Sequence, residues 1–576
     1  MGDANGDGAD TGGAAPSTAG YTVADYLMDR LVEIGVDRVF GVPGDFTLGL
    51  LDHVTAHRGL TWTGCANELN AGYAADGYGR MRGIAALCTT FGVGELSAIN
   101  ALAGSYAEHV PVIEIVGAPA TSAQAAHRIL HHSLGDGVFT HFMDLHAGVT
   151  CARASLTAAD AAAEIDRVLL AARDHRLPGY LLLPVDVAGA PATPPAEPLP
   201  APVDVTDPAA LEAFTRAAAQ LLSDVSTRDI GVLGGVLVHR VGAAAAFADF
   251  VAAGSLDHAT TMWGKSLVDE SAPTFRGIYA GAASDPDVRA VIEDAGSVVV
   301  AGVQFTDLTS GFFTQQLPRE RTVELGVGSA SVGEELFEPV SLPAALRALT
   351  TLVAGRTGTA PASTPVATGP IPGDTDPAEA LGQRSLWDQV AGFVRPGDLV
   401  VADQGTAFYG MATHRLPTGV SFLGQPLWAS IGYSVPALLG ACLAAPGRRG
   451  ILLVGDGAAQ MTLTELATVL RHGLPAVVVV VDNDGYTIER AIHGADEPYN
   501  DIARLDWAAL PATFGPGTDA RGVRAGTVGE LADALADAAA HPARFTLIQA
   551  VVPRDDIPPL LDTLARAAAS ANRVPG

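Results

Sequence analysis

Gly455-Asp456-Gly457 and Asn483-Asp484-Gly485-Tyr486-Thr487-Ile488-Glu489 are the most informative strings in this chain. Each follows a strand-like apolar run, at residues 451–454 and 477–481 respectively. Between the two runs, residues 463–471 carry apolar side chains at helical spacing. A strand, a helix and a strand of these lengths predict a βαβ unit. Both strings should therefore lie at the carboxyl edge of one parallel sheet.

The oxygen-bearing groups of these strings suit a magnesium ion. Mg²⁺ takes about six oxygen ligands, often completed by phosphate and water. The Asp456 carboxylate, the Asn483 amide oxygen and a backbone carbonyl can converge on one such cation. Small residues after Asp456 would let the backbone approach a diphosphate at a helix start. A GDG triplet alone is usually a turn, but the paired strings predict a metal–diphosphate site.

Composition indicates a globular protein of several domains. The chain has 576 residues, which is too long for one core and makes three domains the natural expectation. A net charge of -29 without a basic cluster argues against nucleic acid and anionic membrane surfaces as partners. No apolar stretch reaches the roughly 18 residues that a membrane helix needs. The 4 cysteines are far apart without CxxC spacing, which fits reduced thiols in a cytoplasmic protein.

Changes of composition along the chain predict its domain boundaries. The first 20 residues are rich in Gly, Ala and Asp, lack a signal-peptide pattern and are expected to be a flexible tail. Segments rich in proline or in Gly, Pro, Ser and Thr predict linkers at 191–204 and 356–378. The predicted domains are then 21–190, 205–355 and 379–576. In each, continuous apolar runs alternate with helical stretches, which is typical of sheets covered on both faces. The expected fold class is α/β, with three doubly wound parallel-sheet domains.

Several side chains of the first domain suit acid–base chemistry, and each also has a plain structural explanation. Asp45 follows a strand and would equally cap the next helix. Glu68 lies near a helix start, where a carboxylate interacts favourably with the dipole. In an apolar pocket its raised pKa would instead suit proton exchange with a heterocycle. His131 and His132 are adjacent, so they do not share one helix face, and no nearby Cys or Glu gives zinc-site spacing.

Together, these motifs resemble the thiamine diphosphate-dependent 2-oxo acid decarboxylases. That family includes branched-chain, aromatic, indolepyruvate, phenylpyruvate and pyruvate decarboxylases. The paired GDG and Asn strings are similar to its metal signature. Further matching stretches are 41–45, 67–80, 90–97, 104–108, 131–132, 402–406 and 425–433. Related carboligases such as acetohydroxyacid synthase share the metal signature, but they lack the histidine pair and a Glu489 in such a string.

The resemblance implies thiamine diphosphate and Mg²⁺ as cofactors and assigns residues to them. The Mg²⁺ ligands would be Asp456, Asn483 and the carbonyl of Gly485. Catalytic residues would be Glu68, Asp45, His131, His132 and Glu489. The cofactor-binding residues would be Glu68, Thr406, Ala429, Ile431, Asp456, Gly457, Ala458, Asn483, Gly485, Tyr486 and Ile488. The substrate pocket would be formed by Gln404, Phe408, Ile488, Leu564 and Ala568.

Three of these residues have specific implied roles. Glu68 would hydrogen-bond the pyrimidine ring, and Ile431 would wedge between the two cofactor rings. The carbonyl of residue 429 would accept a hydrogen bond from the cofactor's amino group. Relatives often have Gly at that position, so Ala429 should be tolerated if its backbone angles suit a side chain.

The implied reaction is non-oxidative decarboxylation of a 2-oxo acid to an aldehyde and CO₂ through a thiamine diphosphate enamine. A small Ala568 and the lack of Trp after Trp507 favour branched-chain or aromatic substrates such as 2-oxoisovalerate, phenylpyruvate or indolepyruvate. A pyruvate-preferring enzyme, a carboligase making 2-hydroxyketones and a non-catalytic cofactor binder are the alternatives. The family arrangement implies a homodimer or homotetramer in which the first domain of one subunit faces the last domain of another.

Overall fold

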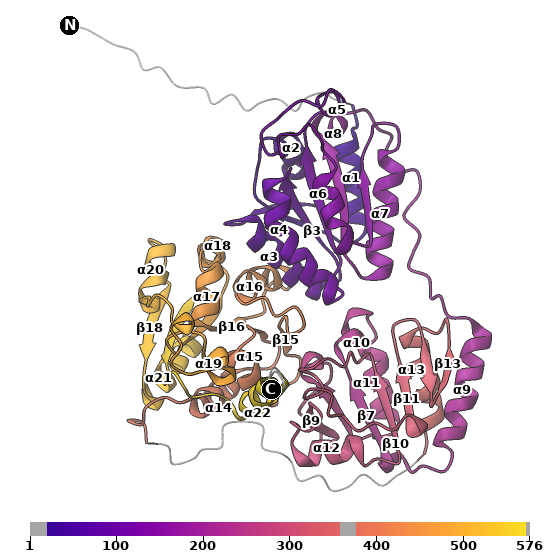
Figure 1. Cartoon of the computed structure of the whole chain (residues 1–576), viewed down its shortest axis with the longest axis vertical. Helices are drawn as coiled ribbons and strands as arrows, with labels where there is room; N and C mark the ends of the chain where they lie inside the picture. The colour runs from indigo at the N-terminus through magenta and orange to yellow at the C-terminus, as the bar shows by residue number, and fades with distance from the viewer. Residues whose placement is uncertain (1–19, 357–375, 572–576) are drawn as a thin grey trace, which may run out of the picture.

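The computed structural model describes residues 20–356 and 376–571, whose strands form three sheets (Figure 1). The tail predicted over residues 1–20, except its last residue, lies outside the described part, as does nearly all of the linker predicted over 356–378. The three-sheet α/β fold expected from the apolar runs is confirmed. None of the described helices combines the length and apolarity that crossing a bilayer requires.

The first sheet is parallel throughout, with strand order β2-β1-β3-β4-β6-β5. Every residue of its central strands β3 and β4 is buried, as their continuous apolar runs predict. Its strands are β1 (Arg38–Gly41), β2 (Thr61–Gly64), β3 (Ala85–Thr90), β4 (Val112–Ala118), β5 (Ala152–Ser155) and β6 (Gly179–Pro184). Its helices are α1 (Val23–Glu33), α2 (Leu48–Ala56), α3 (Glu68–Arg82), α4 (Val93–Ala107), α5 (Thr121–Ala125), α6 (His141–Leu145), α7 (Ala161–His175) and α8 (Val185–Ala188), with the 3₁₀ turn η1 (His146–Gly148).

The middle sheet has order β13-β12-β11-β10-β7-β8-β9 and departs from the fully parallel expectation at one edge. There β11 pairs antiparallel with β12, and β12 pairs antiparallel with β13, to which a two-residue turn containing Gly333, with φ 61°, joins it. Its strands are β7 (Ile230–Gly234), β8 (His258–Thr261), β9 (Phe275–Tyr279), β10 (Ser297–Ala301), β11 (Thr322–Leu325), β12 (Ala330–Val332) and β13 (Glu335–Phe337). Its helices are α9 (Pro208–Leu222), α10 (Val236–Arg240), α11 (Ala244–Ala253), α12 (Pro286–Glu293) and α13 (Leu342–Val353), with η2 (Thr227–Asp229), η3 (Met262–Gly264) and η4 (Arg319–Arg321).

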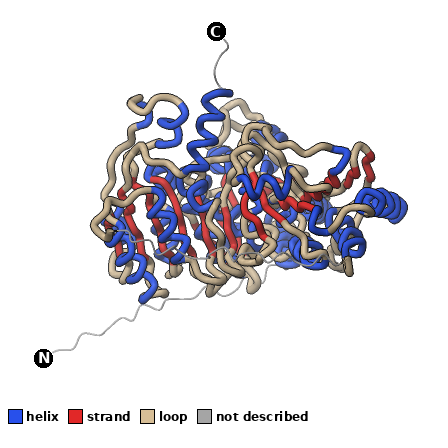
Figure 2. The backbone as a smooth tube through the Cα atoms, turned by 90° about the horizontal axis from the view of Figure 1, so that it is seen from below, coloured by secondary structure: helices blue, strands red, loops and turns tan. Residues whose placement is uncertain are grey.

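The last sheet is again parallel, in the order β15-β14-β16-β17-β19-β18. Seen from below, its strands lie in a layer with helices on both sides (Figure 2). Its strands are β14 (Leu399–Ala402), β15 (Ser421–Leu423), β16 (Gly450–Gly455), β17 (Ala476–Asp482), β18 (Arg521–Ala525) and β19 (Thr546–Val551). Its helices are α14 (Gln383–Phe393), α15 (Thr406–Ala412), α16 (Ser434–Ala444), α17 (Asp456–Thr462), α18 (Glu465–Arg471), α19 (Thr487–Ile492), α20 (Leu510–Phe514), α21 (Val528–Ala540) and α22 (Pro559–Ala571), with η5 (Pro498–Asn500) and η6 (Trp507–Ala509).

Helices α3 and α16 join the first and last domains (Figure 1). Glycines permit this close approach, because a Cβ on Gly440 would lie 1.8 Å from the Ala74 carbonyl oxygen. The Tyr433 hydroxyl donates a 2.6 Å hydrogen bond to the buried Asp76 carboxylate across the contact. Packing and a buried polar bond therefore fix these two domains against each other.

Candidate cofactor site

A cleft opens where β16 and β17 end. These neighbouring strands run in register, with Gly455 opposite Val481, so the two motif strings emerge side by side as expected. The helix expected over 463–471 is present as α18, and a separate short helix, α17, begins at Asp456 itself. The cleft is lined by Gln404, Gly405, Thr406, Ile431, Gly455, Asp456, Gly457, Ala458, Asn483, Gly485, Tyr486, Thr487, Ile488 and Glu489.

Three oxygen atoms of the predicted metal ligands converge in the cleft. The amide oxygen of Asn483 lies 3.1 Å from the Gly485 carbonyl oxygen and 3.2 Å from Asp456 Oδ1, with no donor between them. Turning the amide over would let its nitrogen donate to both oxygens and its oxygen accept from Thr487 at 3.0 Å. Carboxylate, amide and carbonyl oxygens form the donor set that Mg²⁺ prefers. These residues therefore fit a hard divalent cation.

Burial disfavours the charged form of Asp456, which a cation would stabilise. Its side chain is buried, and burial raises the pKa of Asp456 to about 6 even though the Gly457 N–H donates to Oδ1 at 2.7 Å. The Gly485 N–H donates to the other oxygen at 3.2 Å, so both oxygens are oriented by backbone. A bound cation favours the ionised carboxylate. Metal binding and ionisation of Asp456 would thus support each other.

Two glycines make the cleft possible. Gly485 has φ 125°, and a Cβ there would lie 2.1 Å from the Asn500 carbonyl oxygen. A Cβ on Gly457 would lie 2.6 Å from the Tyr486 ring. Side chains at these positions would collide with neighbouring protein atoms, so glycine allows the backbone itself to form this wall of the cleft.

Asp403 is a positioning residue that sequence reasoning did not single out. It is buried directly after β14, and burial raises its pKa to about 6. Its Oδ2 accepts hydrogen bonds from the Ser434 hydroxyl at 2.6 Å and from the Gly432 N–H at 3.1 Å. The turn that carries Ile431 into the cleft is therefore held by this carboxylate. The sequence signal for Asp403 is a charged residue immediately after the apolar run 399–402.

Ala429 adopts a backbone conformation that suits glycine better than alanine. Its φ is 56°, in the left-handed region, so the condition for easy tolerance of a methyl group is not met. Its N–H donates to the Gln425 carbonyl at 2.8 Å. The residue does not line the cleft within this chain.

The predicted substrate residues divide into two groups. Gln404 and Ile488 line the cleft, and the buried Gln404 Oε1 has no hydrogen-bond partner within residues 20–356 and 376–571. Phe408 is 2% exposed and packs edge-on against Tyr409. Leu564 is buried in the core on α22, and Ala568 lies half-buried on that helix, which packs against α19. Their place in a substrate pocket stays a prediction.

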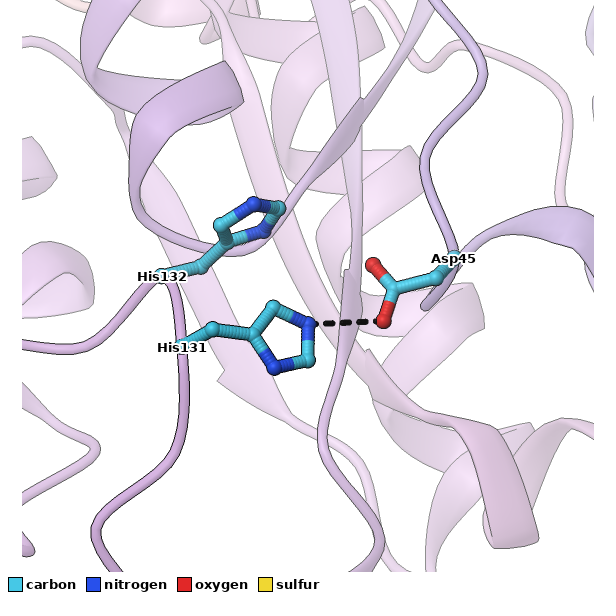
Figure 3. Close-up of side chains that lie close together, drawn as sticks. All are labelled: Asp45, His131 and His132. Atoms are coloured by element: carbon cyan, nitrogen blue, oxygen red, sulfur yellow. Dashed lines mark hydrogen bonds and ion pairs between the residues drawn. The ribbon is translucent and has the colours of Figure 1, made fainter.

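Three predicted catalytic residues of the first domain lie together (Figure 3). His131 Nε2 lies 2.8 Å from Asp45 Oδ2, although 86 positions separate the two residues. The two histidine rings meet edge to face with centroids 4.7 Å apart. The loop after β1 and the segment between α5 and α6 therefore bring the carboxylate and both imidazoles together, which local spacing did not reveal.

Glu68 lies at the start of α3, as expected, and is half-buried. The side chain of Asn67 caps this helix by accepting from the Asn70 N–H at 2.8 Å. Every residue that lines the cleft comes from the last domain, so neither Glu68 nor the Asp45 cluster reaches the cleft of its own chain.

Comparison with known proteins agrees with this geometry. Models of the thiamine pyrophosphate enzymes match the N-terminal TPP binding domain at residues 21–141, the central domain at 215–354 and the C-terminal TPP binding domain at 403–550. An alpha-keto-acid decarboxylase of Mycobacterium tuberculosis is 54% identical over 544 residues, covering 94% of this chain and 96% of that protein. One from Mycobacterium leprae is 53% identical over 554 residues, covering 96% of this chain and 97% of that protein.

A solved structure shares the fold. The thiamine diphosphate-dependent 4-hydroxybenzoylformate decarboxylase of Rhodococcus jostii RHA1 superposes with a TM-score of 0.74 at 19% identity, covering 92% of this chain and 99% of that one. The mycobacterial relatives align with nearly all of the chain, and the family models match a large part of each of its three domains. The chain belongs to the thiamine diphosphate-dependent 2-oxo acid decarboxylase family.

Proposed function

We propose that this protein is a carboxy-lyase that converts 2-oxo acids to aldehydes and CO₂, with thiamine diphosphate and Mg²⁺ in the cleft. The observation that carries the proposal is the convergence of the Asp456, Asn483 and Gly485 oxygens at the sheet edge. It lies inside the match to the TPP binding domain, in a chain whose relatives are named alpha-keto-acid decarboxylases.

Different residues of the cleft would bind the metal ion and the separate parts of thiamine diphosphate. Asp456, Asn483 and the Gly485 carbonyl would hold Mg²⁺, and Gly457 and Ala458 would form the cleft wall next to the cofactor's diphosphate. Thr406, Tyr486 and Ile488 line the space for the rest of the cofactor. Ile431, held by Asp403, supports its rings. When bound, the thiazolium ring stabilises the negative charge that remains on the substrate carbon as CO₂ leaves.

The acid–base residues then serve three tasks. Glu68 exchanges a proton with the cofactor's pyrimidine ring. Glu489, exposed at the cleft edge, and the Asp45–His131–His132 cluster transfer protons to and from the substrate and steer its carboxylate. An apolar surrounding excludes water and favours loss of the charged carboxylate.

These groups meet only if two chains combine, so we propose a homodimer or homotetramer with active sites between subunits. The support is that the cleft contains no residue of the first domain, while the Asp45 and His131 side chains are 49% and 58% exposed. Beside the histidines, Ile129 is 74% exposed and Leu134 is 65% exposed. Apolar side chains exposed around polar catalytic groups are typical of a surface that a second subunit covers.

The substrates proposed are branched-chain or aromatic 2-oxo acids, because Ala568 leaves more room than a large aromatic residue would. The test is to measure aldehyde release from pyruvate, 2-oxoisovalerate, phenylpyruvate and indolepyruvate, with and without thiamine diphosphate and Mg²⁺. A higher kcat/KM for the larger acids is expected, and a strong preference for pyruvate would refute this choice. Release of 2-hydroxyketone without free aldehyde would favour the carboligase.

The 4 cysteines are free thiols, which supports a cytoplasmic setting.

A further inference from the structure

Asp45, His131 and His132 have the composition of a transition-metal site. Their ligand atoms all lie within 4.8 Å of one another (Figure 3). Two imidazole nitrogens with one carboxylate oxygen form a donor set that suits Zn²⁺ and related borderline ions. We propose that this cluster, here called the histidine site, binds a divalent transition-metal ion such as Zn²⁺ separately from the Mg²⁺ cleft.

The side chains of the histidine site are positioned before any ion arrives. The His131 ring stacks on Phe46, with centroids 5.0 Å apart and planes 14° apart. The His132 ring meets the same Phe46 edge to face at 6.1 Å. At His132 the backbone has φ 63°, and its carbonyl lies so close to Gly92 that a Cβ there would be 2.0 Å away. A side chain whose conformation is already fixed by packing loses little conformational entropy when it binds a metal ion.

Both ring nitrogens of His132 lack a hydrogen-bond partner among the residues that the structure describes, and Nδ1 is buried as well. His131 Nε2, by contrast, lies 2.8 Å from the Asp45 carboxylate. Tetrahedral ligands of Zn²⁺ lie about 3.4 Å apart, given bonds near 2.0–2.1 Å. Small side-chain rotations would bring the three donor atoms to that separation.

The two sites differ in the ions they select. The cleft offers only oxygen atoms, which suit Mg²⁺. The histidine site offers nitrogen, for which Mg²⁺ competes poorly. The ion would occupy the imidazole lone pair and the carboxylate that the proposed function uses for proton transfer. This consequence rests on the proposed function: a metal ion in the histidine site should inhibit the proton-transfer steps of decarboxylation without releasing thiamine diphosphate.

The direct test is binding, which needs no turnover. The holoenzyme, saturated with Mg²⁺ and thiamine diphosphate, is titrated with Co²⁺, whose visible absorption strengthens in tetrahedral nitrogen and oxygen coordination. Zn²⁺ binding is measured by calorimetry on the same sample. One ion per chain is expected, and excess Mg²⁺ should not displace it. Asp45→Asn, His131→Gln and His132→Gln should each weaken binding at least about tenfold.

A matched control lies in the same segment. His141 Nε2 contacts Asp136 Oδ2 at 2.7 Å, and both side chains are exposed, so this pair resembles the His131–Asp45 pair but lacks a second histidine. His141→Gln should bind Co²⁺ as the wild type does. The proposal is overturned if the wild type gives no tetrahedral Co²⁺ spectrum, or if the three variants bind as tightly as His141→Gln.

Failure of this site is distinguishable from failure of the proposed function. If the protein releases aldehyde but binds no Co²⁺, only the histidine site is wrong. If it binds Co²⁺ at these residues but decarboxylates no 2-oxo acid, the histidine site is supported and the proposed function is refuted. In an active enzyme, Zn²⁺ should lower kcat, and EDTA with excess Mg²⁺ should restore it. Zn²⁺ that instead releases thiamine diphosphate would show binding in the cleft and contradict the proposal.

Discussion

His146 Nε2 lies 3.2 Å from Glu114 Oε2, and both side chains are 0% exposed within the first domain. Burial alone would lower the pKa of His146, but the Glu114 carboxylate raises it to about 9. Glu95 completes the cluster by accepting from the Tyr180 hydroxyl at 2.7 Å. Burial, followed by repulsion from Glu114, raises the pKa of Glu95 to about 7. The cluster therefore binds protons more tightly in the folded chain than in the unfolded one.

This cluster predicts that stability falls on the alkaline side. A His whose pKa is raised from 6.5 to about 9 stabilises the fold fully below pH 6.5 and loses that effect as the pH rises through 9. Glu95, raised from 4.5 to about 7, acts in the same direction between those values. The His146 contribution is on the order of 3 kcal/mol. Thermal unfolding followed from pH 6 to 10 should show a falling midpoint.

A variant isolates the His146 contribution. In His146→Gln the unfolding midpoint should be lower at pH 6 and should decline less between pH 6.5 and 9 than in the wild type. His141→Gln, which removes an exposed histidine, should keep the wild-type slope. Equal slopes in His146→Gln and the wild type would show that the buried pair does not hold its proton as inferred.

Ala429 is predicted to be strained by its left-handed backbone. At φ 56°, the backbone strain of a non-glycine residue lowers the free energy of unfolding by about 1 kcal/mol. Glycine relieves this strain, but its greater conformational entropy in the unfolded chain offsets part of the gain. Ala429→Gly should therefore change the free energy of unfolding by less than about 1 kcal/mol and keep activity. Ala429→Val, whose branched side chain fits this region poorly, should destabilise the protein by about 1–3 kcal/mol. Denaturant unfolding of both variants measures these changes, and equal stabilities of Ala429→Gly and Ala429→Val would contradict a strained left-handed backbone at this position.

Gly485→Ala should weaken cofactor binding while leaving the domain folded. Its φ of 125° and the Asn500 carbonyl oxygen 2.1 Å from a built Cβ would push the Gly485 carbonyl away from Asp456 and Asn483. Mg²⁺-dependent thiamine diphosphate affinity should fall at least about tenfold. Gly526→Ala is the control, because its nearest neighbour would be 3.7 Å away. Wild-type affinity in Gly485→Ala would remove the carbonyl from the metal site.

Active sites shared between chains predict complementation. Glu68→Gln alone should abolish turnover with the fold intact, and Asp456→Ala alone should also be inactive. Co-expressed, the two would form mixed dimers in which one of two sites has both native residues. About a quarter of wild-type specific activity should return if chains pair at random. No recovery in purified mixed dimers would place each active site within one chain.

The sheets and the meeting of the two motif strings were accessible from sequence because they rest on local patterns. The buried strands β16 and β17 are continuous apolar runs, and the strings after them must meet once the strands are neighbours. Local reasoning failed where distant segments combine. Asp45 reaches His131 across 86 positions, so the third member of that cluster could not be seen from the histidine pair. The left-handed angle of Ala429 also depends on tertiary packing, whereas the antiparallel β12–β13 edge follows from the two-residue turn at Gly333, a local signal that the sequence prediction did not use.

Thiamine diphosphate retention by Asp456→Ala tests the central claim most directly. Removing a buried carboxyl whose pKa is raised to about 6 should not lower the unfolding midpoint of the unloaded protein, so any loss of binding reports on the metal. Asp484→Asn, which removes the charge of a neighbouring carboxylate paired with Arg504 and keeps a side chain that tolerates the local φ of 62°, is the control. In calorimetry with excess Mg²⁺, we expect no cofactor binding by Asp456→Ala and normal binding by Asp484→Asn. Unchanged Mg²⁺-dependent binding by Asp456→Ala would contradict the account.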